Sequence, residues 1–165
     1  MVELEAQKAP KTTENFLQYV RAKHYDGTIF HRVIENFMVQ GGGYDASYVE
    51  RKTRAPVAHE GREALSRGGP RNVVGTLAMA RTNDPNSATA QFFINVVDNM
   101  FLSEPRGGAG YAVFGKVVAG MENVDKIKGV KTGFKNNMPD WPVEDVVLKT
   151  AKILNAEASA KYAGK

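Results

Sequence analysis

The 165-residue sequence contains no cysteine, which excludes disulfide bonds and thiolate chemistry. Its three histidines are dispersed, and no glycine-rich loop leads into a helix as a phosphate-binding loop would. No apolar run is long enough to span a membrane, and the amino-terminal residues lack the basic and apolar regions of a signal peptide. We therefore predict no metal site and no membrane association, and we expect a cytoplasmic protein.

What remains is the composition of a single globular domain. Hydrophobic residues make up 42% and charged residues 24%, both ordinary values, and the length suits one domain with a core. The net charge of +4 is a mild excess, spread among acidic residues. Two glycine pairs at residues 68–69 and 107–108 follow arginines, as in RNA-binding boxes, but isolated pairs are better explained as turns. We expect no nucleic-acid partner.

Residues 28–43 are the most informative stretch. They are rich in β-branched and aromatic residues, with Arg32 and Gln40 set among apolar neighbours. Side chains alternate across a strand, so Arg32 is expected on the face of Phe30 and Ile34. The three final glycines indicate a tight turn or a close backbone approach. This pattern predicts a binding surface on two strands; the alternative is two core strands from which the guanidinium extends to water.

A turn or bulge is expected at residues 35–36, between these two strands. On the second strand Met38 and Gln40 are predicted to share one face, with Phe37 and Val39 on the other. The turn would aim the second strand at the same pocket as the arginine of the first.

The rest of the chain predicts short strands, turns and two helices. One helix should begin near Thr12 or Thr13, after Pro10, and a second should cover residues 121–128 and stop at Gly129. Strands are expected at residues 3–6, 72–80, 91–97, 111–118 and 142–154, with a weaker one at 55–58 inside a long surface excursion. Many short strands separated by turn residues predict an antiparallel sheet closed on itself.

Two further features indicate a binding surface. In the strand at 91–97, Gln91, Phe93 and Asn95 share one face, while the opposite face is wholly apolar. The apolar pair Phe101-Leu102 stands in a loop, where such residues either fill the core or line a site.

Three ordered blocks resemble the cyclophilin family of peptidyl-prolyl cis-trans isomerases. They are residues 30–42 (FHRVI, then FMVQGG), residues 75–95 (GTLAMAR, then SATAQFFIN) and residues 111–118 (YAVFGKVV). The likeness is closest to the bacterial branch and implies an isomerase domain at 1–154 followed by a carboxy-terminal tail at 155–165.

The implied fold is mainly β: a cyclophilin-like antiparallel eight-stranded barrel capped by two α-helices, with a filled interior and the active site on its outer face. The family's first strand is missing from this chain, because residues 2–5 align with its second. Such a gap leaves unpaired strand edges.

The resemblance also implies the activity. The enzyme would accelerate rotation of X-Pro peptide bonds and assist protein folding, without cofactor, metal or covalent intermediate. Arg32 is the expected catalytic residue, donating to the proline nitrogen as it loses amide conjugation. The resemblance also implies four groups of substrate-binding residues. The proline-ring pocket would consist of Phe37, Met38, Phe93 and Leu102, and Gln40 and Gln91 would anchor the substrate or steady Arg32. Main-chain contacts would come from Ala80, Arg81 and Thr82, and the rim would be lined by His31, Phe101 and Tyr111.

Three of these positions differ from those of the better-studied members of the family. Those members have asparagine where this chain has Arg81, tryptophan where it has Phe101, and histidine where it has Tyr111. Phenylalanine cannot donate the hydrogen bond by which that tryptophan holds cyclosporin, so a cyclosporin-type inhibitor should bind weakly. The expected partners are proline-containing peptides and unfolded or flexible chains, and the protein is expected to be monomeric. The alternative function is a catalytically weak chaperone or scaffold that binds proline segments.

Overall fold

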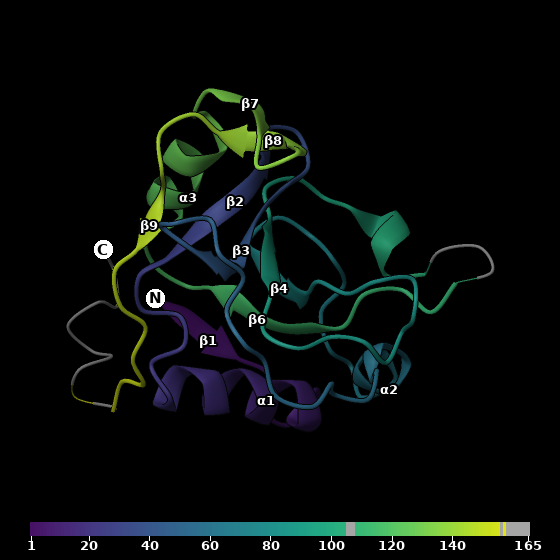
Figure 1. The fold of residues 1–165 in the computed structure, drawn as a ribbon. Helices are drawn as coiled ribbons and strands as arrows, with labels where there is room; N and C mark the ends of the chain where they lie inside the picture. Colours follow the sequence, from purple (N-terminus) through teal and green to yellow (C-terminus); the bar gives the residue numbers. More distant parts are fainter. Residues whose placement is uncertain (105–107, 156, 158–165) are drawn as a thin grey trace.

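The computed structural model describes residues 1–104, 108–155 and 157. Seven strands form one antiparallel sheet in the order β1-β6-β4-β5-β3-β2-β9, and Figure 1 shows that this sheet is strongly curled. The strands are β1 (Val2–Leu4), β2 (Thr28–Ile34), β3 (Met38–Asp45), β4 (Thr76–Met79), β5 (Phe92–Asn95), β6 (Val113–Val117) and β9 (Val147–Leu148). The predicted mainly β, antiparallel fold is confirmed.

The sheet is a half-barrel, so the expectation that it closes on itself is wrong. Strands β1 and β9 are its two edges, and no ladder joins them in the part of the chain that the structure describes. A separate hairpin, β7 (Thr132–Lys135) and β8 (Met138–Pro142), packs on the outer side of β2.

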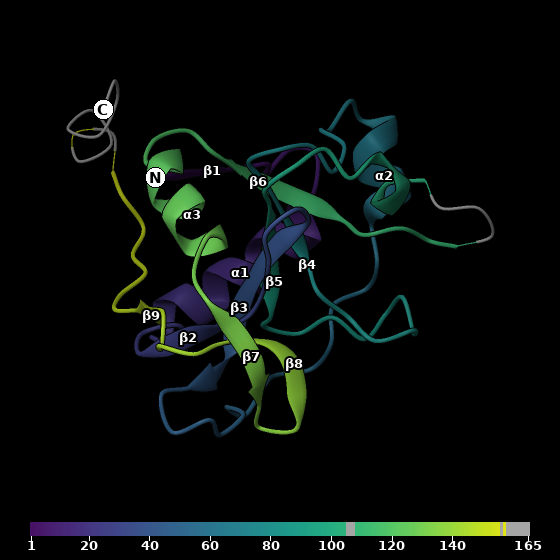
Figure 2. The same cartoon turned by 90° about the horizontal axis from the view of Figure 1, so that it is seen from above.

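Two helices stand at opposite ends of the sheet, as expected: α1 (Pro10–Arg21) and α3 (Met121–Lys128), seen below and above it in Figure 1. Figure 2 views the molecule from above, with α3 nearer the viewer and α1 behind it. Helix α1 begins earlier than predicted, because Pro10 is part of its first turn. Proline is tolerated there, since an N–H group in the first turn would have no acceptor within the helix. Helix α3 ends before Gly129, as predicted. A third helix, α2 (Gly61–Ser66), and a 3-10 turn, η1 (Met100–Leu102), were not predicted.

Other expectations differ from the structure. Residues 55–58 form no strand, and of residues 142–154 only a short part pairs, as the end of β8 and as β9. The β7–β8 hairpin was missed, although its two-residue turn, Asn136 and Asn137 with φ of 51° and 59°, is a common hairpin turn. The predicted tail at 155–165 lies outside the described residues, apart from 155 and 157.

Apolar side chains fill both faces of the sheet. The inner cluster, which includes Phe92, Ile94 and Phe114, packs against α1 and α3 and fills the half-barrel. The outer cluster consists of Met38, Ala78, Phe93, Leu102 and Val113. The predicted alternation along β5 is confirmed, and the outer cluster provides the floor on which the site is built.

Candidate active site

Arg32 reaches the outer face because β2 is irregular. The pairing register of β2 with β3 shifts on either side of Phe30, after which Arg32 lies opposite Gln40. Phe30 is 8% exposed in the inner cluster, whereas Arg32 is exposed to solvent. The prediction that these two residues share a face is therefore wrong, since an extra residue in one strand reverses the alternation that follows it.

The turn predicted at residues 35–36 is confirmed, and it also contains Phe37. Because Phe37 precedes β3 rather than belonging to it, its ring is free to pack with Met38 in the outer cluster. The prediction that Phe37 and Met38 point to opposite faces is wrong for this reason.

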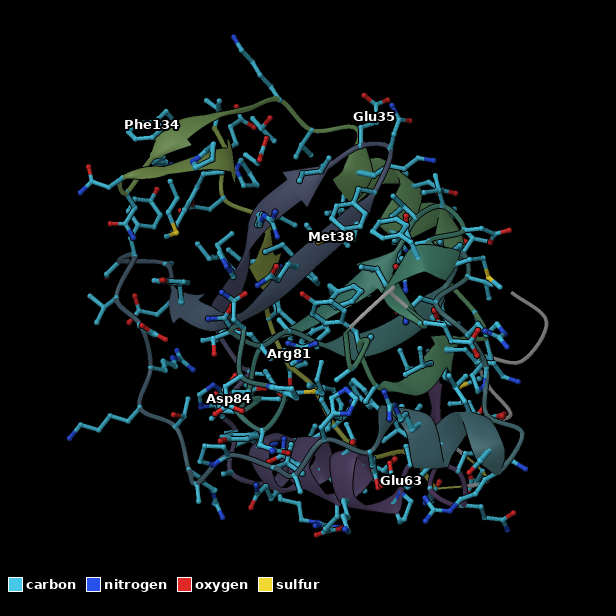
Figure 3. The ribbon with its side chains drawn as sticks, turned by 90° about the vertical axis from the view of Figure 1, so that its right-hand side faces the viewer. Glu35, Met38, Glu63, Arg81, Asp84 and Phe134 are labelled. Carbon is cyan, nitrogen blue, oxygen red and sulfur yellow. The ribbon has the colours of Figure 1, made fainter. Side chains whose placement is uncertain are left out.

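A cavity of about 240 Å³ opens on the outer face. Figure 3 looks onto this face and shows Met38 and Arg81 near its middle, with Glu35 at the turn above them. Nine side chains line the cavity, all of them among the predicted site residues: Arg32, Phe37, Met38, Gln40, Ala80, Arg81, Phe93, Leu102 and Tyr111. The cavity thus has an apolar floor and two guanidinium groups on its walls.

Two glutamines support Arg32. Its Nη1 donates weakly to Gln40 Oε1 at 3.4 Å, and Gln40 Nε2 donates to Gln91 Oε1 at 2.9 Å. The side chain of Gln91 lies directly against Gly43, where a Cβ atom would stand 2.5 Å from Gln91 Nε2. The close backbone approach predicted for the three glycines is confirmed; the alternative, a tight turn, is not, because they lie within β3. Gln91 therefore anchors Gln40 from beneath rather than lining the cavity.

Arg81 is held more firmly than Arg32. Its Nη2 and Nε donate to the carbonyl oxygen of Gly110 at 2.7 and 3.3 Å, and its Nη1 donates to that of Thr82 at 2.8 Å. Its guanidinium carbon lies 4.5 Å from the ring centroid of Tyr111, which meets Phe93 edge-on at 5.7 Å. The guanidinium is thus stacked and hydrogen-bonded at once, so its position at the wall of the cavity is fixed.

The structure adds His59, which the sequence analysis missed. Its Nε2 lies 2.9 Å from the same Gly110 oxygen, and its Nδ1 accepts the N–H of Gly61 at 3.3 Å, which leaves Nε2 as the donor. His59 precedes α2, in the stretch read as a surface excursion, and no local sequence signal marks it. Together with Arg81 it holds the carbonyl that comes just before Tyr111.

Of the predicted rim residues, His31 does not line the cavity, and its expected place there is corrected. It is 5% exposed and packs between Tyr44 and Trp141, with ring centroids at 4.7 and 5.6 Å. Burial, with a smaller contribution from the neighbouring Arg32 charge, lowers the pKa of His31 to about 4. The ring is therefore a neutral packing element under the β7–β8 hairpin.

Two other predicted residues border the cavity without lining it. Phe101 is 62% exposed and stacks on Phe37 with ring centroids 6.0 Å apart, which extends the apolar floor outward. Thr82 is exposed, and its hydroxyl and N–H both bond to Ser87 Oγ within the loop after β4. The side chain of Thr82 is thus occupied with its own loop.

The chemistry of this cavity is that of binding and hydrogen-bond donation. Its polar side chains carry guanidinium, amide and phenol groups, its walls carry no carboxylate, and its floor suits a small apolar ring. Among residues 1–104, 108–155 and 157, no three His, Asp or Glu side chains gather where they could hold a metal ion. In the same described part of the chain, no helix is long and apolar enough to cross a membrane.

Comparison with known proteins decides the family. The model of the family described as "Cyclophilin type peptidyl-prolyl cis-trans isomerase/CLD" matches residues 1–153. This chain belongs to the cyclophilin family. It is a peptidyl-prolyl cis-trans isomerase, an enzyme that accelerates rotation of X-Pro bonds, and its similar relatives include bacterial ones.

Two relatives and one solved structure illustrate how far the likeness extends. Peptidyl-prolyl cis-trans isomerase cyp18 of Streptomyces antibioticus is 56% identical over 157 residues, covering 93% of this cyclophilin and 92% of that protein. Peptidyl-prolyl cis-trans isomerase B of Escherichia coli K12 is 51% identical over 149 residues, with 88% of each chain covered. A Cryptosporidium parvum cyclophilin type isomerase, crystallised in the presence of the dipeptide Ala-Pro, shares the fold, with a TM-score of 0.62 at 23% identity over 90% of this chain and 88% of that one.

Proposed function

We propose that the cavity on the outer face is where this cyclophilin holds the proline ring of its substrate, with Arg32 as the catalytic residue. The observation that carries the proposal is the arrangement of an apolar floor, formed by Phe37, Met38 and Phe93, beside a solvent-facing guanidinium. Leu102 completes this floor. A proline ring is small and apolar, and such a floor would bury it next to a strong donor.

Rotation of an X-Pro bond breaks amide resonance, which gives a barrier of about 20 kcal/mol and an uncatalysed time of about 10 to 100 s. As the bond twists, the proline nitrogen becomes pyramidal and gains a lone pair that neither planar form has. A donor aimed at this nitrogen therefore binds the transition state in preference to the substrate. A thousandfold acceleration needs roughly 4 kcal/mol of such preference, within reach of one charge-assisted bond in a partly desolvated site.

The Arg32 guanidinium is suited to this role. Its only hydrogen bond to another described residue is the long one to Gln40, which leaves most of its five N–H donors available to a substrate. The chain from Gln91 through Gln40 restrains the guanidinium without neutralising it, because both glutamines are uncharged. In this scheme Gln40 and Gln91 are positioning residues.

The remaining predicted contacts fit around this centre. Ala80, Arg81 and Thr82 would offer main-chain groups to the residues that precede the proline, and Tyr111 and Phe101 would contact the substrate at the rim. Because such a site reads only a proline ring and a short length of main chain, we propose that it acts on exposed X-Pro bonds in unfolded or flexible chains. It would thereby assist folding, as a cytoplasmic monomer without cofactor.

The test is cis-trans exchange of an Ala-Pro peptide measured by NMR, with the wild type, Arg32→Ala and Arg32→Lys. Loss of the donor should lower kcat/KM by about 10² to 10³ with little change in peptide affinity. Arg21→Ala is the matched control, since Arg21 is an exposed arginine of α1 paired with Glu14. Thermal unfolding of each variant shows whether it is folded.

Each result has a definite meaning. Full activity in a folded Arg32→Ala variant would remove Arg32 from the catalytic role. Peptide binding without accelerated exchange in the wild type would favour the alternative, a chaperone or scaffold that grips proline segments.

A further inference from the structure

The cavity is positively charged and has no acidic wall. Arg32 and Arg81 both line it, and none of its nine lining residues is an aspartate or a glutamate. None of the five ion pairs found in the described part of the chain includes either arginine. The acceptors that hold these guanidinium groups are an amide oxygen and main-chain carbonyls, which leave the positive charge uncompensated.

Three acidic residues lie close to the cavity in sequence, and one of them, Glu35, stands at the turn between β2 and β3. Asp84, in the loop after β4, accepts the N–H of Asn86 through Oδ1 at 2.9 Å. Glu104, beyond η1, pairs with Arg71 at 2.9 Å. No ion pair in the described part of the chain joins Glu35, Asp84 or Glu104 to Arg32 or Arg81, so a ligand can supply the opposite charge.

Arg81 is the better placed of the two to read a substrate side chain. Three of its five N–H donors are used on Gly110 and Thr82, so two remain. Its stacking on Tyr111 and its bonds fix the guanidinium before any substrate arrives, which lowers the entropy lost on binding. A fixed guanidinium with unused donors at the wall of an apolar cavity suits a carboxylate on a neighbouring residue of the bound chain.

We propose that Arg81 is a specificity-determining residue, which makes this cyclophilin favour X-Pro segments that carry an aspartate or glutamate within two residues of the proline. The inference rests on the proposed function only in that the cavity is taken as the substrate site. It assigns a preferred substrate class, acidic proline segments, to an enzyme whose ring pocket alone would accept any proline.

A purely structural role for Arg81 is the competing explanation, because the side chain also holds Gly110 and Tyr111 in place. The two explanations differ in what they do to selectivity. Loss of a structural support lowers the activity on all peptides alike, whereas loss of a charge partner lowers it only on acidic ones. The ratio of kcat/KM for a Glu peptide to that for its Gln counterpart separates them, since the two peptides differ in charge and hardly in shape.

The experiment uses proline peptides in matched Glu and Gln pairs, with the variable residue two before, one before or one after the proline. Exchange is measured by NMR and corrected for the uncatalysed rate of each peptide, and affinity is measured by titration of amide shifts. For at least one position we expect the Glu peptide to be favoured about two- to fivefold at low salt, the range of an exposed ion pair. The preference should shrink in about 0.5 M NaCl, where screening acts over a few ångströms.

Variants assign the preference to a residue. Arg81→Gln should bring the Glu to Gln ratio to about one, and Arg81→Lys should keep part of it, because lysine retains the charge. Arg21→Gln on α1 removes the same charge far from the cavity and should leave the ratio unchanged, which separates a local contact from the net charge of the protein.

The outcomes distinguish this inference from the proposed function. Equal catalysis of both members of every pair would overturn the acidic preference and leave the isomerase site intact. A preference that survives in Arg81→Gln would also overturn it and would point to Arg32. If the folded wild type binds the peptides without accelerating exchange, the catalytic proposal fails, and the titrations still decide the acidic preference through the ratio of Glu to Gln affinities.

Discussion

Glu60 should be one of the most important side chains for the stability of this cyclophilin. Its carboxylate is 2% exposed, and it accepts the N–H of Thr12 at 2.6 Å through Oε1 and that of Lys11 at 3.3 Å through Oε2. These are amides of the first turn of α1, which have no partner within the helix. The residue before the helix, Ala9, has no side chain that could cap them. A residue remote in sequence therefore does the capping.

The size of the effect follows from these contacts. The short bond from Thr12 to a charged acceptor contributes about 1.5–3 kcal/mol, and a negative charge at the start of a helix adds about 0.3–1 kcal/mol. Glu60→Ala should therefore lower the free energy of unfolding by about 2–4 kcal/mol. Glu60→Gln keeps one oxygen acceptor and should lower it by about half as much. For a domain of this size each kcal/mol corresponds to about 2–4 °C, so the alanine variant should lose roughly 4–16 °C in Tm.

Thermal unfolding followed by circular dichroism, together with urea titration, measures both variants. Glu63→Ala is the matched control, because Glu63 is an exposed carboxylate in the first turn of the adjoining α2. If Glu60→Ala changes the free energy of unfolding by less than about 1 kcal/mol, or if Glu63→Ala has as large an effect, then the capping argument is wrong.

Three further predictions concern single residues: His31, Gly43 and Phe101. Burial lowers the pKa of His31 to about 4 from an ordinary 6.5, so the unfolded chain takes up the proton first as the pH falls. The wild type should therefore lose about 2 kcal/mol of unfolding free energy between pH 7 and pH 5 that His31→Gln does not lose, as measured by urea titration at both pH values. Gly43→Ala places a Cβ atom against Gln91 and should lower kcat/KM about tenfold by releasing the support of the arginine, with no further loss when combined with Gln91→Ala. Phe101→Trp restores an indole N–H at an exposed edge of the site and should strengthen binding of a cyclosporin-type inhibitor about tenfold in calorimetry.

Each of these predictions has a result that would contradict it. An equal loss of stability on acidification in His31→Gln would show that other groups dominate the pH response. Additive losses in the Gly43 and Gln91 double variant would mean that the two residues act independently. An unchanged inhibitor affinity in Phe101→Trp would show that the missing donor is not what limits binding.

Much of the site could be predicted because its residues come in short blocks that lie on strands. Arg32 and Gln40 stand on β2 and β3, which follow each other along the chain and pair directly, so their local pattern survives folding; Phe93 stands on β5, which pairs with β3 although β4 lies between them in sequence. The face of the sheet on which each side chain lies was harder to predict. One irregularity in the pairing near Phe30 moves Arg32 to the outer face, and the alternation of side chains along a strand does not predict where such an irregularity occurs.

What could not be predicted depends on contacts between distant segments. His59 and Glu60 have no periodicity or motif, and their roles exist only because the α2 segment folds back against both α1 and the loop before Tyr111. The small size of β9 has a similar cause. Residues 142–154 have strand-forming composition, but Val147–Leu148 is all that pairs with β2, and chain composition does not say how long an edge strand will be.

The two-sided burial of β4 and β5 limits how this enzyme can change. Every residue of these strands is buried: Phe92 and Ile94 fill the half-barrel, while Phe93, turned the other way, forms part of the cavity floor and packs with Ala78 in the outer cluster. A substitution that reshapes the floor also disturbs the packing of the whole domain, because a single strand supports both layers. New preferences for substrates or drugs should therefore arise at the rim, at exposed positions such as Phe101, where a side chain can be exchanged at little risk to folding. The ring-binding floor would stay constant through such change.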